Sequence, residues 1–321
     1  MKHLNKNRFQ GIYPPIITPI KNGSVDTGGL ERLVEHVISG GVQGFFILGT
    51  TGEGPGLSES DKALVIRNVS AQVGKRLPVL VAITDTVMND SIALAEIAFA
   101  AGADAIVIAP PYYLPPGQAE FLDYLDFILP RLPLPLFLYN MPSMTKVHLS
   151  PATLAEAVLR PGIAGLKDSS GDMNYFHDIL QVFAGKDLAL FTGSEVLLGE
   201  SVVFGAQGGV CGGANVCPEL FVEMWQASRD GKIEEMRRLQ RQWHLFSNIY
   251  RHGHHASSGI KGIKCALSLL GICGDEMAAP FSAFVERERA LVHEDLEKFK
   301  IERKVLSKCK MMKGKRRCSS S

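Results

Sequence analysis

Residues 134–170 have the sequence LPLFLYNMPSMTKVHLSPATLAEAVLRPGIAGLKDSS. Two apolar runs, Leu134–Asn140 and Ile163–Ser170, flank a helical pattern at Ser150–Leu159. That pattern opens with a serine, which is favoured at helix N-caps, and Pro151 takes the first helical position, where its missing N–H is not needed. Neither apolar run alternates with polar residues, which is typical of strands buried on both faces in a parallel sheet. The stretch therefore predicts one strand–helix–strand unit.

The same pattern repeats along most of the chain. Six further apolar runs have the same character: Gly11–Thr18, Gly44–Thr50, Pro78–Thr84, Ala103–Pro110, Leu188–Glu195 and Ala206–Asn215. Between the runs lie helical patterns at Thr27–Ser39, Glu59–Val73, Asp90–Ala101, Ala119–Leu129, Asn174–Ala184 and Glu195–Phe204. Eight strands with helices between them favour a closed (β/α)₈ TIM barrel of the α/β class over an open sheet.

We expect the barrel to occupy residues 8–217. Residues 218–302 are mostly helical in pattern and should form a C-terminal helical extension packed on the barrel. Residues 303–321 should form a disordered basic tail, since the chain from Ile301 onward carries eight Lys or Arg against one acid. A basic segment can contact nucleic acid or acidic lipid, but a solvated terminus is the simpler interpretation. We predict neither nucleic acid nor membrane as a partner.

Composition places the chain among ordinary globular proteins. Hydrophobic residues make up 46% of it and charged residues 21%, which excludes the disordered and fibrous classes. Residues 1–10 are polar and basic and lack the apolar core of a signal peptide, and no run of about 18 apolar residues predicts a membrane span. The six cysteines include no Cys-x-x-Cys pair, so we expect reduced thiols and a cytoplasmic location.

Lys167 is the strongest catalytic candidate. Barrel enzymes carry their active sites at the C-terminal ends of the strands, so the polar residues that end the apolar runs are the ones to consider. Lys167 lies within such a run, IAGLKDSS. Burial favours the neutral amine of a lysine, which attacks a ketone to form an imine. The alternative interpretation is a structural lysine paired with Asp168 or another nearby acid.

Two other strand ends carry groups suited to imine chemistry. Tyr139 ends the run that precedes Lys167, and its phenol can transfer protons. Alternatively, it is a core aromatic whose hydroxyl binds the backbone. The segment Gly49–Glu53 (GTTGE) follows the second strand. Its threonines offer donors to a carboxylate, although an ordinary turn has the same composition.

Two further clusters suggest different chemistry. Gly208–Gly209 and Gly212–Gly213 follow the seventh strand, where many barrels bind phosphate. His252, His254 and His255 lie close in the sequence, but two of them would face one metal only in an extended segment, so we predict no metal. Since an imine supplies its own electron sink, we expect no flavin, nicotinamide or other cofactor.

Four motifs occur in order with the spacing of barrel strands. They are GTTGE at Gly49–Glu53, PPYY at Pro110–Tyr113, YNMP at Tyr139–Pro142 and GLKDSSGD at Gly165–Asp172. Together with GIYPPIITP near the start, they make the chain similar to the dihydrodipicolinate synthase / N-acetylneuraminate lyase family. The resemblance runs from about Gly11 to Phe281 and implies a TIM barrel with pyruvate-dependent class I aldolase chemistry.

The resemblance also implies roles for individual residues. Lys167 would form the Schiff base with pyruvate, and Tyr139 would transfer protons. Thr50 and Thr51 would hold the carboxylate of the 2-oxo acid, with Thr50 also relaying protons. Tyr113 would enter the active site of a neighbouring subunit, which implies a homo-oligomer, either a tetramer or a dimer of dimers. The other expected substrate contacts are Gly49, Val210 through its carbonyl, Gly193, Glu195 and Met144.

The chain departs from two branches of this family. Synthases that condense pyruvate with aspartate semialdehyde carry an arginine where this chain has Met144, and Lys146 is the nearby residue able to replace its charge. Sialic-acid lyases usually have a serine–threonine pair in place of Thr50–Thr51, and no acidic pair follows Gly193 here. We therefore predict a lyase whose partners are pyruvate and an aldehyde, with a substrate of the 2-keto-3-deoxy sugar acid type.

Several alternatives stay open. Within the family they are dihydrodipicolinate synthase (4-hydroxy-tetrahydrodipicolinate synthase) and N-acetylneuraminate lyase. Met144 suits an aldehyde that is recognised through hydroxyls elsewhere, or one with an apolar or aromatic tail. Outside this chemistry, a non-catalytic barrel that binds a 2-oxo acid, or a phosphate-binding barrel enzyme with its ligand at Gly208–Gly213, would share the fold.

Overall fold

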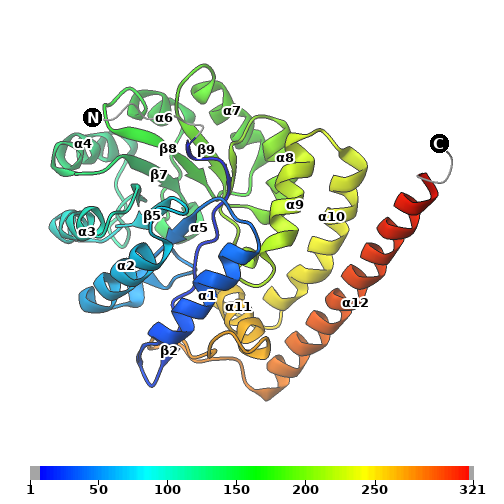
Figure 1. Ribbon diagram of the computed structural model, residues 1–321. Helices are drawn as coiled ribbons and strands as arrows, with labels where there is room; N and C mark the ends of the chain where they lie inside the picture. Colours follow the sequence, from blue (N-terminus) through cyan, green and yellow to red (C-terminus); the bar gives the residue numbers. More distant parts are fainter. Residues whose placement is uncertain (1–7, 318–321) are drawn as a thin grey trace.

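The computed structural model describes the backbone of residues 8–317 and the side chains of residues 8–303. Its centre is one parallel sheet, in which the strands follow the order β1, β10, β9, β8, β7, β6, β5, β4 (Figure 1). The strands are β1 (Gly11–Ile12), β4 (Phe45–Ile47), β5 (Val79–Ala82), β6 (Ala105–Ile108), β7 (Leu136–Asn140), β8 (Ile163–Asp168), β9 (Ala189–Thr192) and β10 (Gly208–Gly209). Each of them lies inside one of the predicted apolar runs. A short hairpin, β2 (Ile20–Lys21) and β3 (Ser24–Val25), stands apart from this sheet.

The sheet closes on itself where the chain continues beyond β1. Phe46 in β4 donates its N–H to the Pro14 carbonyl (3.0 Å), and Ile16 donates to the Phe46 carbonyl (2.9 Å). At the other edge, β10 pairs with β1 through Gly208 and Gly11. A Cβ on Gly208 would overlap the Gly11 carbonyl, so this close approach of two strands requires glycine. The predicted (β/α)₈ barrel is thereby confirmed.

Helices cover the outside of the barrel between successive strands (Figure 1). They are α1 (Thr27–Ser39), α2 (Glu59–Val73), α3 (Met88–Ala100), α4 (Gln118–Ile128), α6 (Pro151–Ala157), α7 (Met173–Phe183) and α8 (Leu198–Val203). The Ser150 hydroxyl caps α6, as the sequence predicts. In contrast, α3 begins at Met88 rather than at Asp90, because the Asp85 carboxylate accepts from the Val87 N–H (3.2 Å) and fixes the turn that starts the helix.

Aromatic side chains fill the lower part of the barrel. Phe9 packs edge-on against Phe137 with ring centres 5.1 Å apart, and Phe137 stacks on Phe191 at 6.0 Å. Tyr13 lies 5.0 Å from the same Phe191 ring. The interior is thus a packed core rather than a channel, and polar side chains can gather only at the upper ends of the strands.

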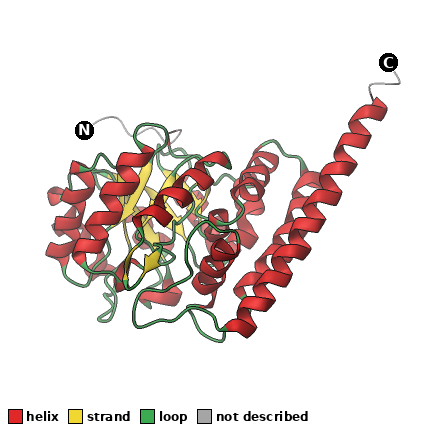
Figure 2. Ribbon diagram, turned by 60° about the horizontal axis from the view of Figure 1, so that its bottom comes forward, coloured by secondary structure: helices red, strands yellow, loops and turns green. Residues whose placement is uncertain are grey.

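The helices that follow β10 are α9 (Pro218–Arg229), α10 (Ile233–Phe246), α11 (Ser258–Leu269) and α12 (Glu286–Arg317). Of these, α9 packs on α8 and α10, and α12 packs on α10 and α11. Figure 2 shows α12 extending well past the other helices. The structure continues α12 through residues 303–317, where the sequence predicts a disordered tail, and this segment is rich in the good helix formers Lys, Arg, Leu and Met. Residues 318–321 of the expected tail lie outside the described residues. Within residues 8–317, no helix combines the length and apolar character needed to cross a membrane.

Candidate active site

Lys167 lies near the C-terminal end of β8, inside the barrel. It stands directly opposite Tyr139 of β7 on one side and Phe191 of β9 on the other. Only 5% of Lys167 is exposed. Its Nζ lies 4.1 Å from the centre of the Tyr139 ring and 4.4 Å from that of Phe46. The amine is therefore held between two aromatic rings, at the end of the barrel where active sites form.

Asp168 points away from Lys167, because side chains alternate along a strand. Its carboxylate accepts from the Asn140 side-chain amide (2.8 Å) and from the Ser170 hydroxyl (2.9 Å). Burial raises the pKa of Asp168, although these hydrogen bonds oppose the shift. The carboxylate is engaged on the far side of the strand, so the interpretation of Lys167 as the ion-pair partner of Asp168 is wrong.

The Tyr139 phenol is buried beside the lysine and interacts with the side chains of Lys167, Ser169 and Thr50. Burial alone would raise the pKa of Tyr139. The charge of Lys167 and hydrogen bonds from these three side chains outweigh it, so the pKa lies below its ordinary value. A phenol of lowered pKa exchanges protons more readily near neutral pH. Because its partners are side chains, Tyr139 is not simply a core aromatic bound to the backbone.

Ser169 and Phe46 are neighbours of this pair that the sequence analysis missed. Ser169 follows Lys167 by two residues in an extended segment, so the two-residue period of a strand places both on one face. Gly193, after β9, lies against both side chains. A Cβ at Gly193 would come within 3.1 Å of Lys167 Cε and would overlap the Ser169 hydroxyl. Gly193 therefore leaves the space that the lysine occupies.

Val210 directly follows β10 and lies next to β9. It is 3% exposed, and its N–H donates to the Thr192 carbonyl at the end of β9 (2.8 Å). The next residue, Cys211, is fully buried, and burial raises the pKa of its thiol well above the ordinary value. The Lys167 charge acts on the same thiol in the opposite direction. The structure thus brings the end of β10 close to the amine.

The turn after β4 carries the two threonines expected to bind a carboxylate. Gly49 packs against the Phe46 ring so closely that a side chain would not fit. Thr50 reaches the Tyr139 phenol, and both Thr50 and Thr51 are half-buried. The predicted residues Lys167, Tyr139 and Thr50 therefore come together, and Gly49 packs on the Phe46 ring that contacts the lysine amine.

A buried ion pair, which the sequence analysis missed, ties this turn to the C-terminal helices. Glu53 has a left-handed backbone (φ 57°) and is 7% exposed. Its carboxylate contacts the amine of Lys264 in α11 and accepts from the Ala278 N–H (2.9 Å). Lys264 is fully buried and also donates to the Glu276 carbonyl (2.8 Å). The pair holds the GTTGE turn, α11 and residues 276–278 together as one unit.

A cavity of about 450 Å³ is lined by Tyr139 and Thr50. Further parts of its wall come from the turn after β4, from residues 141–145, which include α5 (Pro142–Thr145), from residues 255–260 and from residues 277–281. Met144 on α5 is 42% exposed and lines this cavity. The Lys146 amine donates to the Ser143 carbonyl (2.7 Å), so it does not supply the cation that Met144 lacks.

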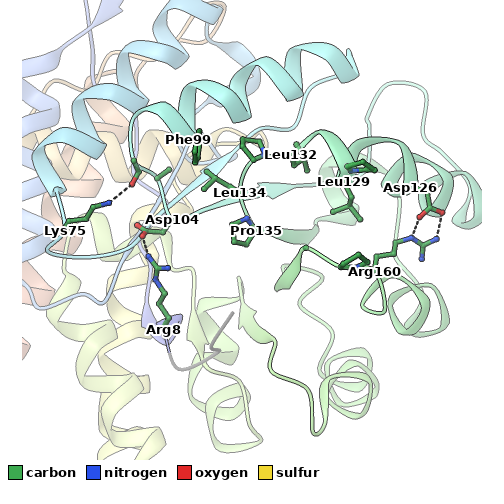
Figure 3. Close-up of a pocket in the computed structure, with 16 residues that line it drawn as sticks. Arg8, Lys75, Phe99, Asp104, Asp126, Leu129, Leu132, Leu134, Pro135 and Arg160 are labelled. Carbon is green, nitrogen blue, oxygen red and sulfur yellow. Dashed lines mark hydrogen bonds and ion pairs between the residues drawn. The ribbon is translucent and has the colours of Figure 1, made fainter. Parts of the chain in front are cut away.

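A larger hollow, of about 890 Å³, lies at the opposite end of the barrel, before β6, β7 and β8 begin (Figure 3). Leucines and prolines line much of it. Its two arginines are paired, since Arg160 binds Asp126 (2.6 Å) and Arg8 binds Asp104. It contains none of the predicted site residues, and barrel enzymes carry their active sites at the other end. We therefore assign the site to the smaller cavity.

Glu195 lies just after β9, and its carboxylate faces the C-terminal helices. One oxygen accepts from the Gly213 N–H (2.6 Å), and the other accepts from the Trp243 indole (3.0 Å) and from the Tyr250 hydroxyl (3.0 Å). Burial raises the pKa of Glu195, while these bonds lower it. Two consequences follow. A direct substrate contact would require Glu195 to give up a partner, and Gly213 already gives its N–H to this carboxylate of the protein itself rather than to a phosphate.

Tyr113 does not line the cavity of its own chain. It is 97% exposed with a positive φ of 74°, whereas the adjacent Tyr112 lines the cavity. Of the three histidines near position 250, His252 is bonded to Asp295 of α12 (2.5 Å), and His255 lines the cavity. Within residues 8–303, no cluster of His, Cys, Asp and Glu has the arrangement of a metal site.

Comparison with known proteins agrees with this geometry. The chain matches the model of the dihydrodipicolinate synthetase family over residues 8–299. The chain belongs to this family. A 4-hydroxy-tetrahydrodipicolinate synthase of Hyphomonas neptunium is 34% identical to it over 277 residues, which cover 86% of this chain and 93% of that protein. The family consists of pyruvate-dependent class I aldolases, so the chain is an enzyme of the lyase type.

Solved structures of the same family superpose on nearly the whole barrel. The dihydrodipicolinate synthase of Bacteroides thetaiotaomicron is 47% identical, with a TM-score of 0.87 over 90% of this chain and 98% of that one. YagE, a prophage protein of Escherichia coli K12 from the dihydrodipicolinic acid synthase family, was solved in complex with pyruvate. It is 27% identical, with a TM-score of 0.86 over 91% of this chain and 99% of that one.

Proposed function

We propose that this enzyme makes or breaks a carbon–carbon bond between pyruvate and an aldehyde through a Schiff base on Lys167. The observation that carries the proposal is the buried amine, held against Tyr139 and free of Asp168. After the ammonium gives up its proton, the neutral amine attacks the pyruvate ketone, water leaves, and an imine forms. Loss of a proton from C3 then gives an enamine, which adds to the aldehyde carbon. Hydrolysis of the imine releases the product and restores the amine.

Tyr139 and Thr50 are the groups that we propose to move the protons. The phenol touches both the lysine and the Thr50 side chain, and its pKa is lowered by these neighbours against the effect of burial. It can therefore donate to the departing hydroxyl of the carbinolamine and recover the proton afterwards. Thr50 and Thr51 would bind the carboxylate of pyruvate, with Val210 and Gly193 on the opposite side of the imine.

The aldehyde partner, in this proposal, carries no carboxylate of its own. A guanidinium would hold a second carboxylate with two charge-assisted hydrogen bonds, but Met144 has neither charge nor donor. Two classes of aldehyde satisfy this condition. One is the hydroxylated aldehyde released from a 2-keto-3-deoxy sugar acid, whose single carboxylate belongs to the pyruvate half. The other is an aldehyde with an apolar tail.

A second candidate is 4-hydroxy-tetrahydrodipicolinate synthase, with aspartate semialdehyde as the aldehyde. The names of the relatives favour it, including that of the Hyphomonas protein and of the Bacteroides structure. Condensation of pyruvate with aspartate semialdehyde, measured for the wild type and for Met144→Arg, separates the two. We expect the activity of the wild type to be about 10²-fold lower than that of the arginine variant. This factor corresponds to the loss of two charge-assisted hydrogen bonds to the second carboxylate. Efficient turnover by the wild type would favour the synthase.

The proposal as a whole is tested by turnover, which a non-catalytic binding barrel would lack. Lys167→Ala should abolish release of pyruvate from any substrate that the wild type cleaves, and Lys167→Arg should do so too, because a guanidinium stays protonated. Tyr139→Phe should lower kcat by about 10²–10⁴-fold with the fold retained. A lysine variant that keeps its activity would disprove imine catalysis by this residue.

A further inference from the structure

The cavity that receives the aldehyde is walled by apolar side chains from three separate elements. Met141 and Met144 come from the segment after β7, Ile260 from α11, and Met277 and Phe281 from the loop before α12. Met144 and Phe281 are 42% and 55% exposed. Large apolar side chains left open around a concave site are typical of ligand recognition rather than of packing.

Two threonine hydroxyls of this wall, those of Thr84 and Thr145, are bound to the backbone. Thr84 Oγ1 accepts from the Ala109 N–H (2.9 Å). Thr145 Oγ1 donates to the Met141 carbonyl (3.1 Å), and Thr145 is only 5% exposed. Beside Met144 and Phe281 a substrate hydroxyl would meet thioether and ring atoms, and each hydroxyl without a partner weakens binding.

The charges of the wall are also engaged. Glu53 is the acid in it, and its carboxylate is bound by Lys264 and by the Ala278 N–H. The nearby Lys146 is held by the Ser143 carbonyl. Tyr112, His255 and Ser257 are the other polar side chains of the wall outside the lysine's immediate neighbourhood. A wall of this composition suits an uncharged ligand with one polar end. In an aldehyde with an apolar tail, that polar end is the reacting carbonyl.

We infer that the aldehyde bound by this enzyme carries an apolar, ring-sized tail, which lies between Met144 on one side and Phe281 on the other. The inference rests on the proposed function and narrows it from two classes of aldehyde to one. A cavity of about 450 Å³ has room for pyruvate and a single ring. Methionine side chains adapt to a flat ring and make favourable sulfur–aromatic contacts with it.

The reaction with the simplest such partner balances without a further reactant. The pyruvate enamine on Lys167 forms a bond from C3 to the carbonyl carbon of benzaldehyde, and the carbonyl oxygen takes up a proton. Water then hydrolyses the imine, so one pyruvate and one benzaldehyde give one 4-hydroxy-2-oxo acid. The same steps in reverse release pyruvate from that acid.

The test compares benzaldehyde with glyceraldehyde as probes in the presence of pyruvate, using the full-length chain and following the product by mass. We expect kcat/KM to be about tenfold higher for benzaldehyde than for glyceraldehyde. This factor is at the lower end of the discrimination between substrates that an apolar pocket achieves. Met144→Gln, which keeps the length but adds a polar amide, should lower kcat/KM for benzaldehyde about tenfold. The matched control is Met88→Gln at the start of α3, where a half-buried methionine lies outside the cavity, and it should leave the preference unchanged.

The outcomes separate this inference from the proposed function. A preference for glyceraldehyde, or a Met144→Gln variant that behaves like the wild type, would overturn the apolar tail while the imine chemistry stands. Absence of turnover with every aldehyde, together with no borohydride-trapped pyruvate on the wild type, would instead overturn the proposed function on which the inference rests.

Discussion

Lys167 and Tyr139 depend on each other, because the register between β7 and β8 places them side by side. The charged amine lowers the pKa of the phenol, and the phenol offers the amine a proton donor and acceptor within its own pocket. This arrangement is built from two strand ends whose other side chains, Asn140 and Asp168, bind each other on the far face. One pair of strands thus supplies a reactive face and a structural face.

The lowered pKa of Tyr139 can be observed directly. We predict that tyrosinate absorbance, followed from neutral to alkaline pH, shows one ionisation below the ordinary value of about 10. This early step should be missing in Tyr139→Phe. In Lys167→Met it should move to higher pH, because the positive charge that stabilises the phenolate is gone.

Buried and half-buried tyrosines elsewhere cannot imitate this early step, since burial shifts their pKa values in the opposite direction. It raises the pKa of Tyr124 to about 12, and those of Tyr112, Tyr175 and Tyr250 also rise. Retention of an early ionisation in Tyr139→Phe would contradict the assignment, as would a wild type that shows none.

Residue by residue, the sequence could locate reactive groups better than it could find their partners. Lys167 and Tyr139 stand out because each ends an apolar run, and that pattern is local. The orientation of Glu195 cannot be predicted from neighbouring residues, because its partners Trp243 and Tyr250 lie 48 and 55 residues further along the chain. A carboxylate beside a glycine turn looks the same in sequence whether it faces a substrate or an indole.

Among the contacts between elements, we expect the ion pair that joins the GTTGE turn to α11 to have the largest effect on the free energy of unfolding. Glu53 and Lys264 are both buried, so removal of one leaves the other as an unpaired charge. We predict that Lys264→Met lowers the free energy of unfolding by about 3–5 kcal/mol in a denaturant titration. Lys261→Met, on the same helix but half-buried, is the control and should change it by less than about 0.5 kcal/mol.

The double variant separates an ion pair from simple packing. Because Glu53→Gln removes the charge that Lys264→Met would leave unpaired, the two changes together should cost less than the sum of the single changes. Strict additivity would mean that the two side chains do not act as a pair.

The elements themselves were largely predictable, since parallel strands buried on both faces produce apolar runs that need no distant information. The exceptions have particular causes. Hydrogen bonding by the Asp85 side chain starts α3 before the residue that looks like its cap. The segment after residue 303 continues α12 because helix propensity, rather than charge, decides its backbone.

For the whole molecule, Tyr113 is the residue that bears most directly on the oligomeric state. A large side chain that is 97% exposed, on a residue with positive φ, contributes nothing to the fold of its own chain. We propose that it enters the site of a neighbouring copy, as the family resemblance implies. Light scattering should then give four times the mass of one 34.9 kDa chain.

Mixing two inactive variants tests this role of Tyr113. Tyr113→Ser and Lys167→Ala should each be inactive alone, and activity should return when they are refolded together, because mixed oligomers contain sites with an intact lysine and a tyrosine from the neighbour. A monomer of unchanged activity, or no recovery on mixing, would contradict the proposal.

Trapping the imine at Lys167 tests catalysis by this residue without relying on any choice of aldehyde. The wild type is incubated with pyruvate and borohydride, digested, and examined by peptide mass spectrometry. We predict a single reduced pyruvate adduct, on the peptide that contains Lys167, and none in Lys167→Ala. An adduct on Lys261 or Lys264 instead, or no adduct at all, would contradict the account.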